Sequence, residues 1–96
     1  MRPSEVLEKN RQAIRDATKR FNAANPRVFG SVARGEDRPD SDLDILVDAL
    51  PGTTLFDLGG LLEELQDILG VKVDLVTPGG LPDKIKARVL SEASAI

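Results

Sequence analysis

Residues 30–47, GSVARGEDRPDSDLDILV, are the stretch from which the fold and a site can be argued. The end of this stretch, residues 42–47, predicts a strand whose odd-numbered apolar residues face a core, while Asp42 and Asp44 share the opposite face. Carboxylates at positions i and i+2 of a strand lie about 6–7 Å apart and can reach one metal ion or bridge two. A cation would relieve their mutual repulsion. Taken alone, such a pair more often belongs to a solvated turn.

A Gly-Ser pair precedes this strand and follows a short segment, Arg27 to Phe29, that is also expected to be a strand. Backbone N–H groups at the start of a helical turn can bind phosphate. Gly30 would let a ligand approach the backbone, and Ser31 adds a hydroxyl donor. Arg34 supplies a cation suited to phosphate oxygens. For the Gly-Ser pair alone, an ordinary turn with a capping serine is the simpler interpretation.

A third carboxylate, Asp74, lies within the apolar segment 71–77, which is expected to be a strand. An unpaired buried carboxylate is costly, so Asp74 either has a cationic partner or lies on an exposed face. If its strand neighbours the strand at 42–47, Asp74 can face Asp42 and Asp44; a structural salt bridge is the alternative. Three carboxylates beside a phosphate-binding turn fit phosphoryl-group chemistry assisted by two divalent ions.

The remaining segments predict helices around these strands. Ser4 is expected to cap the first helix and Asn25-Pro26 to end it. Thr54 and Asp57 resemble a capping box ahead of a stripe of leucines. The expected helices are residues 4–24, 32–35, 55–69 and 82–91.

Three details complete the expected fold. Gly70 is expected to stop the third helix. Gly59 and Gly60, inside that helix, suggest either a close packing contact or a frayed first turn. The order of elements predicts an α/β (α+β) fold with a small mixed β-sheet flanked by helices, in one domain spanning residues 1–96.

Composition limits the possible chemistry of the 96-residue chain. Because it contains no cysteine and no histidine, disulfides, zinc–thiolate sites and imidazole catalysis are excluded. Oxygen ligands favour hard cations such as Mg²⁺ or Mn²⁺. A net charge of −3 argues against direct nucleic-acid binding. We expect a cytoplasmic protein, because the chain shows neither an apolar run long enough for a membrane span nor a signal peptide.

Three motifs taken together carry a family resemblance: G-S-x-A-R-G at 30–35, S-D-x-D-I-L-V at 41–47 and K-V-D-L-V at 72–76. This combination resembles the polymerase β-like nucleotidyltransferase superfamily. It is most similar to the minimal nucleotidyltransferases encoded beside HEPN-domain proteins in prokaryotic toxin–antitoxin pairs. The resemblance extends over nearly the whole chain and implies a polymerase β palm-like fold.

The resemblance also implies roles for individual residues. Asp42 and Asp44 would ligate both Mg²⁺ ions, and Asp74 would hold the catalytic ion and help to deprotonate the acceptor hydroxyl. Gly30 and Ser31 would hold the triphosphate of ATP. A phosphate-facing role is implied for one further residue, Arg34.

The family activity implied is transfer of AMP from ATP to a tyrosine of a HEPN toxin, in a hetero-oligomer with that toxin. Three alternatives remain at this point. The chain could be a non-catalytic antitoxin that neutralises its toxin by binding only. It could be a nucleotidyltransferase for small molecules, although such enzymes usually carry extra acceptor-binding domains. It could also be a structural α/β domain without a nucleotide site.

Overall fold

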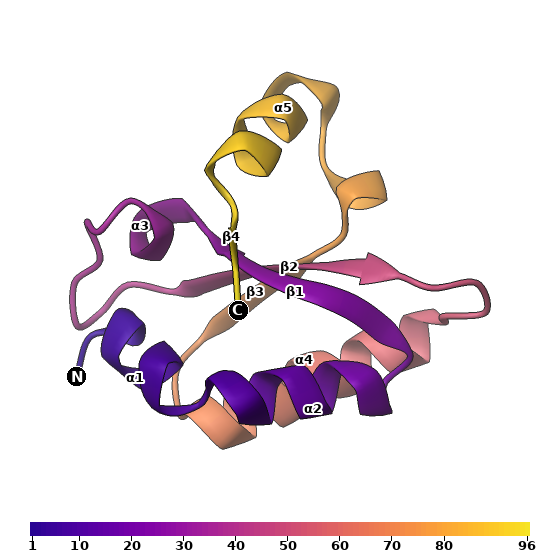
Figure 1. Cartoon of the computed structure of the whole chain (residues 1–96), viewed down its shortest axis with the longest axis horizontal. Helices are drawn as coiled ribbons and strands as arrows, with labels where there is room; N and C mark the ends of the chain where they lie inside the picture. The colour runs from indigo at the N-terminus through magenta and orange to yellow at the C-terminus, as the bar shows by residue number, and fades with distance from the viewer.

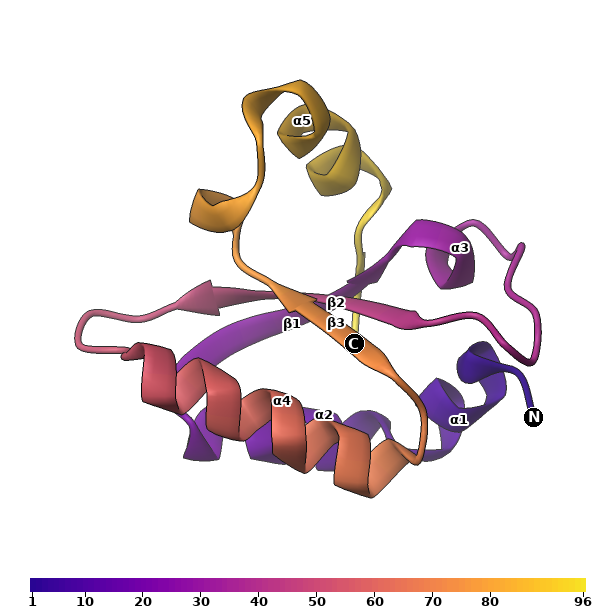
Figure 2. The same cartoon turned by 180° about the vertical axis from the view of Figure 1, so that it is seen from behind.

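A computed structural model describes all 96 residues and contains one four-stranded sheet in the order β3-β2-β1-β4. Helices α1, α2 and α4 cover one face of the sheet, while η1 and α5 rise from the other (Figures 1 and 2). Every helix is too short or too polar to cross a bilayer. The elements are α1 (Pro3–Lys9), α2 (Arg11–Arg20), β1 (Ala23–Phe29), α3 (Gly30–Ala33), β2 (Leu43–Ala49), α4 (Leu55–Leu69), β3 (Val73–Val76), η1 (Pro78–Gly80), α5 (Asp83–Glu92) and β4 (Ser94–Ala95).

The predicted fold class is confirmed, because the sheet is mixed and flanked by helices. β2 pairs antiparallel with β1 and parallel with β3, and β4 adds to the free edge of β1. Leu43, Ile45 and Val47 of β2 have no exposed surface and belong to one hydrophobic cluster with residues of α1, α2 and α4. The alternation predicted for β2 therefore holds, and it leaves the face with Asp44 turned away from those helices.

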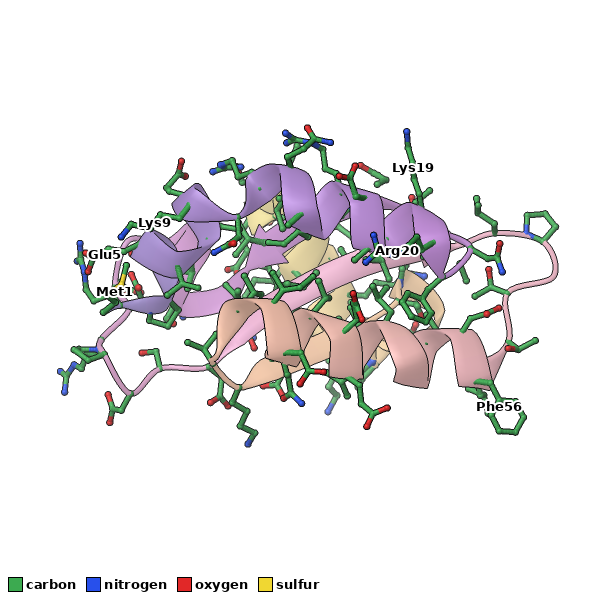
Figure 3. The ribbon with its side chains drawn as sticks, turned by 90° about the horizontal axis from the view of Figure 1, so that it is seen from below. Met1, Glu5, Lys9, Lys19, Arg20 and Phe56 are labelled. Atoms are coloured by element: carbon green, nitrogen blue, oxygen red, sulfur yellow. The ribbon has the colours of Figure 1, made fainter.

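The predicted helix at 55–69 is observed with its caps. The Thr54 hydroxyl accepts a hydrogen bond from the Asp57 N–H at 3.1 Å, and the Asp57 carboxylate accepts one from the Thr54 N–H at 3.0 Å. Gly70 ends the helix in the left-handed conformation, with φ 66°. Seen from below, α2 and α4 lie side by side, and the Arg20 side chain of α2 reaches Glu64 of α4 at 2.8 Å (Figure 3).

The single helix predicted at 4–24 is wrong. It is broken at Asn10, whose side-chain amide donates to the Val6 carbonyl at 2.8 Å. Asparagine side chains compete in this way with the backbone hydrogen bonds of a helix. Ser4 is not the cap either: Arg2 holds that position, and the Ser4 N–H donates to the carboxylate of Asp37, which ties the loop before β2 to α1.

Asn25-Pro26 does not end the helix as predicted; it lies inside β1. The helix stops earlier, at Arg20, and both Asn22 and Asn25 take positive φ angles of 59° and 55°. Asparagine tolerates this conformation better than most residues. The register of β1 shifts between Ala24 and Arg27, and such a bulge is one of the few places where a strand accepts proline.

Other element boundaries differ by a few residues from the predictions. The short helix is 30–33 rather than 32–35, so Gly30 is its first residue. β2 extends beyond residue 47 and includes Asp48. The C-terminal residues form a strand that pairs with β1. In α5, Val89 is buried, whereas Leu90 is 44% exposed.

The two glycines inside α4 should respond oppositely to alanine substitution. A Cβ at Gly59 would meet nothing within 4 Å, whereas one at Gly60 would lie 2.6 Å from Cε1 of Phe21. We expect Gly59→Ala to raise the free energy of unfolding by about 0.5–1 kcal/mol through helix propensity. The free energy of unfolding of the Gly60→Ala variant should be about 1–3 kcal/mol lower than that of the Gly59→Ala variant, because the added methyl group overpacks against Phe21. Urea denaturation of both variants measures the difference.

The control is a third substitution, Phe21→Ala, which removes the ring that a Cβ at Gly60 would meet. In that background the close contact no longer exists, so Gly60→Ala should recover most of the gain seen for Gly59→Ala. Equal effects of the two glycine substitutions in the wild-type chain would show that Phe21 moves aside freely.

Candidate active site

Asp44 and Asp74 form an acidic pair on the sheet face opposite α2 and α4. β2 and β3 run parallel, and their register places these two residues directly beside each other. The two carboxyl groups are within hydrogen-bonding reach. Burial, followed by the hydrogen bond and charge of Asp74, raises the pKa of Asp44 to about 6, and the charge of Asp42 adds to the effect. The sheet thus holds two like charges together without a cation of its own between them.

Asp42 lies one pleat before Asp44, just outside the start of β2, and takes a different partner. Its carboxylate lies 3.6 Å from Nζ of Lys72, with 38% of the Asp42 side chain and 70% of the Lys72 side chain exposed. No group of three acidic side chains adopts a metal-binding arrangement. The structure therefore brings Asp44 and Asp74 into contact and leaves Asp42 nearby, paired with a lysine.

Gly30 is the point where the backbone touches the acidic pair. A Cβ built on this residue would fall far inside contact distance of Oδ2 of Asp44, and the φ angle of Gly30 is +73°. Any other residue would both strain this backbone and collide with the carboxylate. The glycine predicted to approach a ligand thus approaches the carboxylate of Asp44, and the turn and the acidic pair form one site.

The predicted phosphate-binding residues Gly30 and Arg34 already share an anionic partner, Glu92. Oε2 of Glu92 accepts a hydrogen bond from the Gly30 N–H at 2.6 Å and another from Nη1 of Arg34 at 3.1 Å. Oε1 of Glu92 lies 3.2 Å from the same Nη1. Arg34 also donates through Nε to Glu36 at 2.7 Å. We call the Gly30 N–H and the Arg34 guanidinium together the anion site.

Ser31 is half-buried at the second position of α3, adjacent to the anion site. Because α3 has only four residues, its dipole contributes little and the individual donors matter more. The N-terminus of α3 is therefore a weaker phosphate site than expected from the sequence, whereas the Gly30 N–H and the Arg34 guanidinium both bind a carboxylate in this structure.

Two residues of this region escaped the sequence analysis. The position of Lys72 near the site could have been predicted, because Lys72 lies two residues before Asp74 and therefore on the same side of the chain. The position of Glu92 could not have been predicted in this way. Glu92 lies 58 residues from Arg34 and contacts it only because β4 returns the chain to the edge of β1. Local sequence patterns do not predict such a contact.

The arrangement has two halves of opposite character. The acidic half, with Asp44, Asp74 and the nearby Asp42, favours a hard cation with oxygen ligands. The anion site lies against it, because Gly30 contacts Asp44 through its Cα and Glu92 through its N–H. Adjacent cation- and anion-binding groups are what a metal-bound polyphosphate requires.

Comparison with known proteins shows which proteins the whole chain is similar to. A protein adenylyltransferase of Thermococcus cleftensis, MntA, is 39% identical over 87 residues, which are 91% of this chain and 85% of that protein. A Methanocaldococcus jannaschii protein, provisionally named a protein adenylyltransferase, is 44% identical over 66 residues, 69% of this chain and 71% of that protein. A solved structure, provisionally described as a minimal nucleotidyltransferase, superposes with a TM-score of 0.83 at 45% identity, covering 97% of this chain and 93% of that one.

A more distant solved structure, of a toxin–antitoxin with AMP-PNP, has the same fold with a TM-score of 0.76 at 23% identity, covering 90% of this chain and 71% of that one. The family model described as the nucleotidyltransferase domain matches residues 9–96. Because this model covers residues 9–96 and the relative MntA is 39% identical over 91% of the chain, the chain belongs to the nucleotidyltransferase domain family.

Proposed function

We propose that the chain transfers AMP from ATP to a hydroxyl group of a partner protein, with Asp42, Asp44 and Asp74 as the catalytic residues and metal ligands. The observation that carries the proposal is the contact between the Asp44–Asp74 pair and Gly30. This contact joins a place for a cation to donors for phosphate. The relative named protein adenylyltransferase supports a protein as the acceptor.

The acidic pair fits a divalent metal ion. Its two carboxyl groups lie side by side, and the raised pKa of Asp44 shows that the negative charge there lacks compensation. Oxygen ligands and the family chemistry favour Mg²⁺, with Mn²⁺ as a substitute. When bound, such ions would neutralise charge on the attacking and leaving oxygens.

Asp42 would act as a metal ligand together with Asp44 and Asp74 once its ion pair with Lys72 is broken. An exposed ion pair of this kind contributes little to stability, so its loss opposes metal binding only weakly. The Asp42 side chain would then turn from Lys72 toward the acidic pair.

The triphosphate would be held by Gly30, Ser31 and Arg34. The hydrogen bonds that the Gly30 N–H and Arg34 make to a carboxylate support this assignment. Charge-assisted bonds from guanidinium and backbone N–H groups suit phosphate oxygens equally well.

In the proposed reaction the acceptor oxygen bonds to the α-phosphorus of ATP as the bond from that phosphorus to the bridging oxygen breaks, and pyrophosphate leaves. The proton of the acceptor hydroxyl passes to Asp74. Asp74 is exposed at the edge strand β3, so an acceptor on another molecule can reach it. Positioning and charge compensation are the main contributions of the protein to such a transfer.

For the acceptor we propose a tyrosine of a HEPN-type toxin that forms a hetero-oligomer with the chain. Two observations support a toxin partner. The relative MntA is itself a protein adenylyltransferase, and solved toxin–antitoxin structures share the fold. On this proposal the chain is the antitoxin, and modification of the toxin is the means of neutralisation.

Asp74→Asn should lower AMP transfer at least about a hundredfold while leaving the fold intact, because it removes a proposed ligand and also relieves repulsion with Asp44. Transfer is measured with labelled ATP, Mg²⁺ and a HEPN-type toxin as the proposed acceptor. Asp44→Asn should have the same effect.

The matched control is Asp67→Asn, which removes one charge from an exposed position of α4. It should transfer AMP at the wild-type rate. If toxin neutralisation survives in the Asp44→Asn variant with no label moved, the chain acts by binding only, and the catalytic proposal is wrong.

The raised pKa of Asp44 predicts a pH-dependent loss of stability when no metal is present. Between its ordinary value of 3.8 and about 6, the folded state holds a proton that the unfolded state has released. The stability that this group contributes is therefore full below pH 4 and is lost as the pH rises through about 6. Asp44→Asn should be more stable than the wild type at pH 7 in EDTA, with the difference vanishing at pH 4.

Chemical denaturation of both proteins from pH 4 to pH 8 tests this prediction, and the difference between them cancels the other titrating groups. Adding Mg²⁺ at pH 7 should stabilise the wild type more than the variant, because only the wild type has the charged pair. A pH-independent difference would contradict the assignment of the raised pKa to Asp44.

A further inference from the structure

The C-terminal end of α5 holds the donors that the proposed function assigns to the triphosphate. We propose that Glu92 is an internal anion in the anion site, and that the nucleotide must displace it before the site can be used. The inference rests on the proposed function, since it concerns how that same site is kept closed in the free protein.

The contacts of Glu92 are those of a bound anion. One oxygen, Oε2, accepts from both the Gly30 N–H and the Arg34 guanidinium, at 2.6 and 3.1 Å. The Glu92 side chain is only 18% exposed, although the residue ends a surface helix. A phosphate oxygen bound to the same N–H would occupy the same place, so the carboxylate and the triphosphate exclude each other.

Electrostatic repulsion adds to the steric competition between the Glu92 carboxylate and the triphosphate. Arg34 lies between two carboxylates, Glu36 at 2.7 Å and Glu92 at 3.1 Å, so its single positive charge is already matched. A triphosphate that approached with Glu92 in place would meet a nearby negative charge. Only when Glu92 leaves do the Gly30 N–H and one edge of the guanidinium become free.

The surrounding structure allows this release without unfolding. α5 stands away from the sheet (Figures 1 and 2), and Val89 is its only buried residue. The segment after it is anchored independently: β4 pairs with β1, and the Ile96 N–H donates to the Pro26 carbonyl at 3.0 Å. Because β4 begins at Ser94 and stays paired, release would come from the Glu92 side chain and from the turns of α5 before it.

If only a fraction of molecules has Glu92 displaced, the apparent affinity for nucleotide falls by that fraction. Glu92→Gln removes the charge, and Glu92→Ala removes the side chain. Calorimetric titration of the full chain with Mg²⁺ and AMP-PNP should show binding about tenfold tighter in both variants.

The matched control is Glu36→Gln, which removes the same charge from the other side of Arg34 but leaves the Gly30 N–H covered. It should change the affinity by less than about twofold, as expected for an exposed pair. Circular dichroism establishes that each variant is folded.

Hydrogen exchange gives a second measurement on the unmodified chain. With Mg²⁺ and AMP-PNP bound, amides of residues 83–92 should exchange faster, because their terminal contact is lost. Slower exchange there, or weaker binding by Glu92→Gln, would mean that Glu92 assists the nucleotide, and the inference would be wrong.

The two proposals fail in different ways. If the wild type binds AMP-PNP and the Glu92 variants bind it no better, the internal-anion proposal is wrong and the proposed function stands. If none of the variants binds AMP-PNP with Mg²⁺, both proposals are wrong.

Discussion

The parallel pairing of β2 with β3 forces two carboxylates together, and much of the site depends on this constraint. Asp44 and Asp74 cannot separate without changing the register, which Leu43 and Val73 fix by burial in the core. Burial and the neighbouring Asp74 together raise the pKa of Asp44 to about 6. The stability of the sheet thus maintains an unfavourable charge pair, which is a common property of sites prepared for a ligand.

Features of the structure whose physical cause is local could be predicted from the sequence. The alternation of β2 decides which residues enter the core, and Thr54, Asp57 and Gly70 decide where α4 begins and ends. The site residues Gly30 and Asp44 were also identifiable, because a glycine before a single helical turn and a strand with alternating acids are both short-range patterns. Their direct contact was not, because it requires the pairing of β1 with β2.

The predictions that were wrong, and the residue that was missed, depend on contacts that are not local patterns of the sequence. The hydrophobic pattern of residues 4–24 continues through Asn10, where the helix breaks and the side chain donates a hydrogen bond to the Val6 carbonyl. Asn25-Pro26 suggested a helix end, but the bulge in β1 accommodates it within the sheet. Glu92 reaches the site from the far end of the chain, through the pairing of β4 with β1. In each case a tertiary or side-chain contact outweighed local propensity.

In the free protein each half of the site already has an internal partner of opposite charge. Asp42 is paired with Lys72, and the anion site is paired with Glu92. A cation alone would replace only Lys72, and a polyphosphate alone would replace only Glu92. Under the proposed function a metal-bound nucleotide replaces both of them at once, so the binding of metal and the binding of nucleotide are coupled. The internal partners would then weaken the binding of a lone ion or a lone anion relative to the binding of both together.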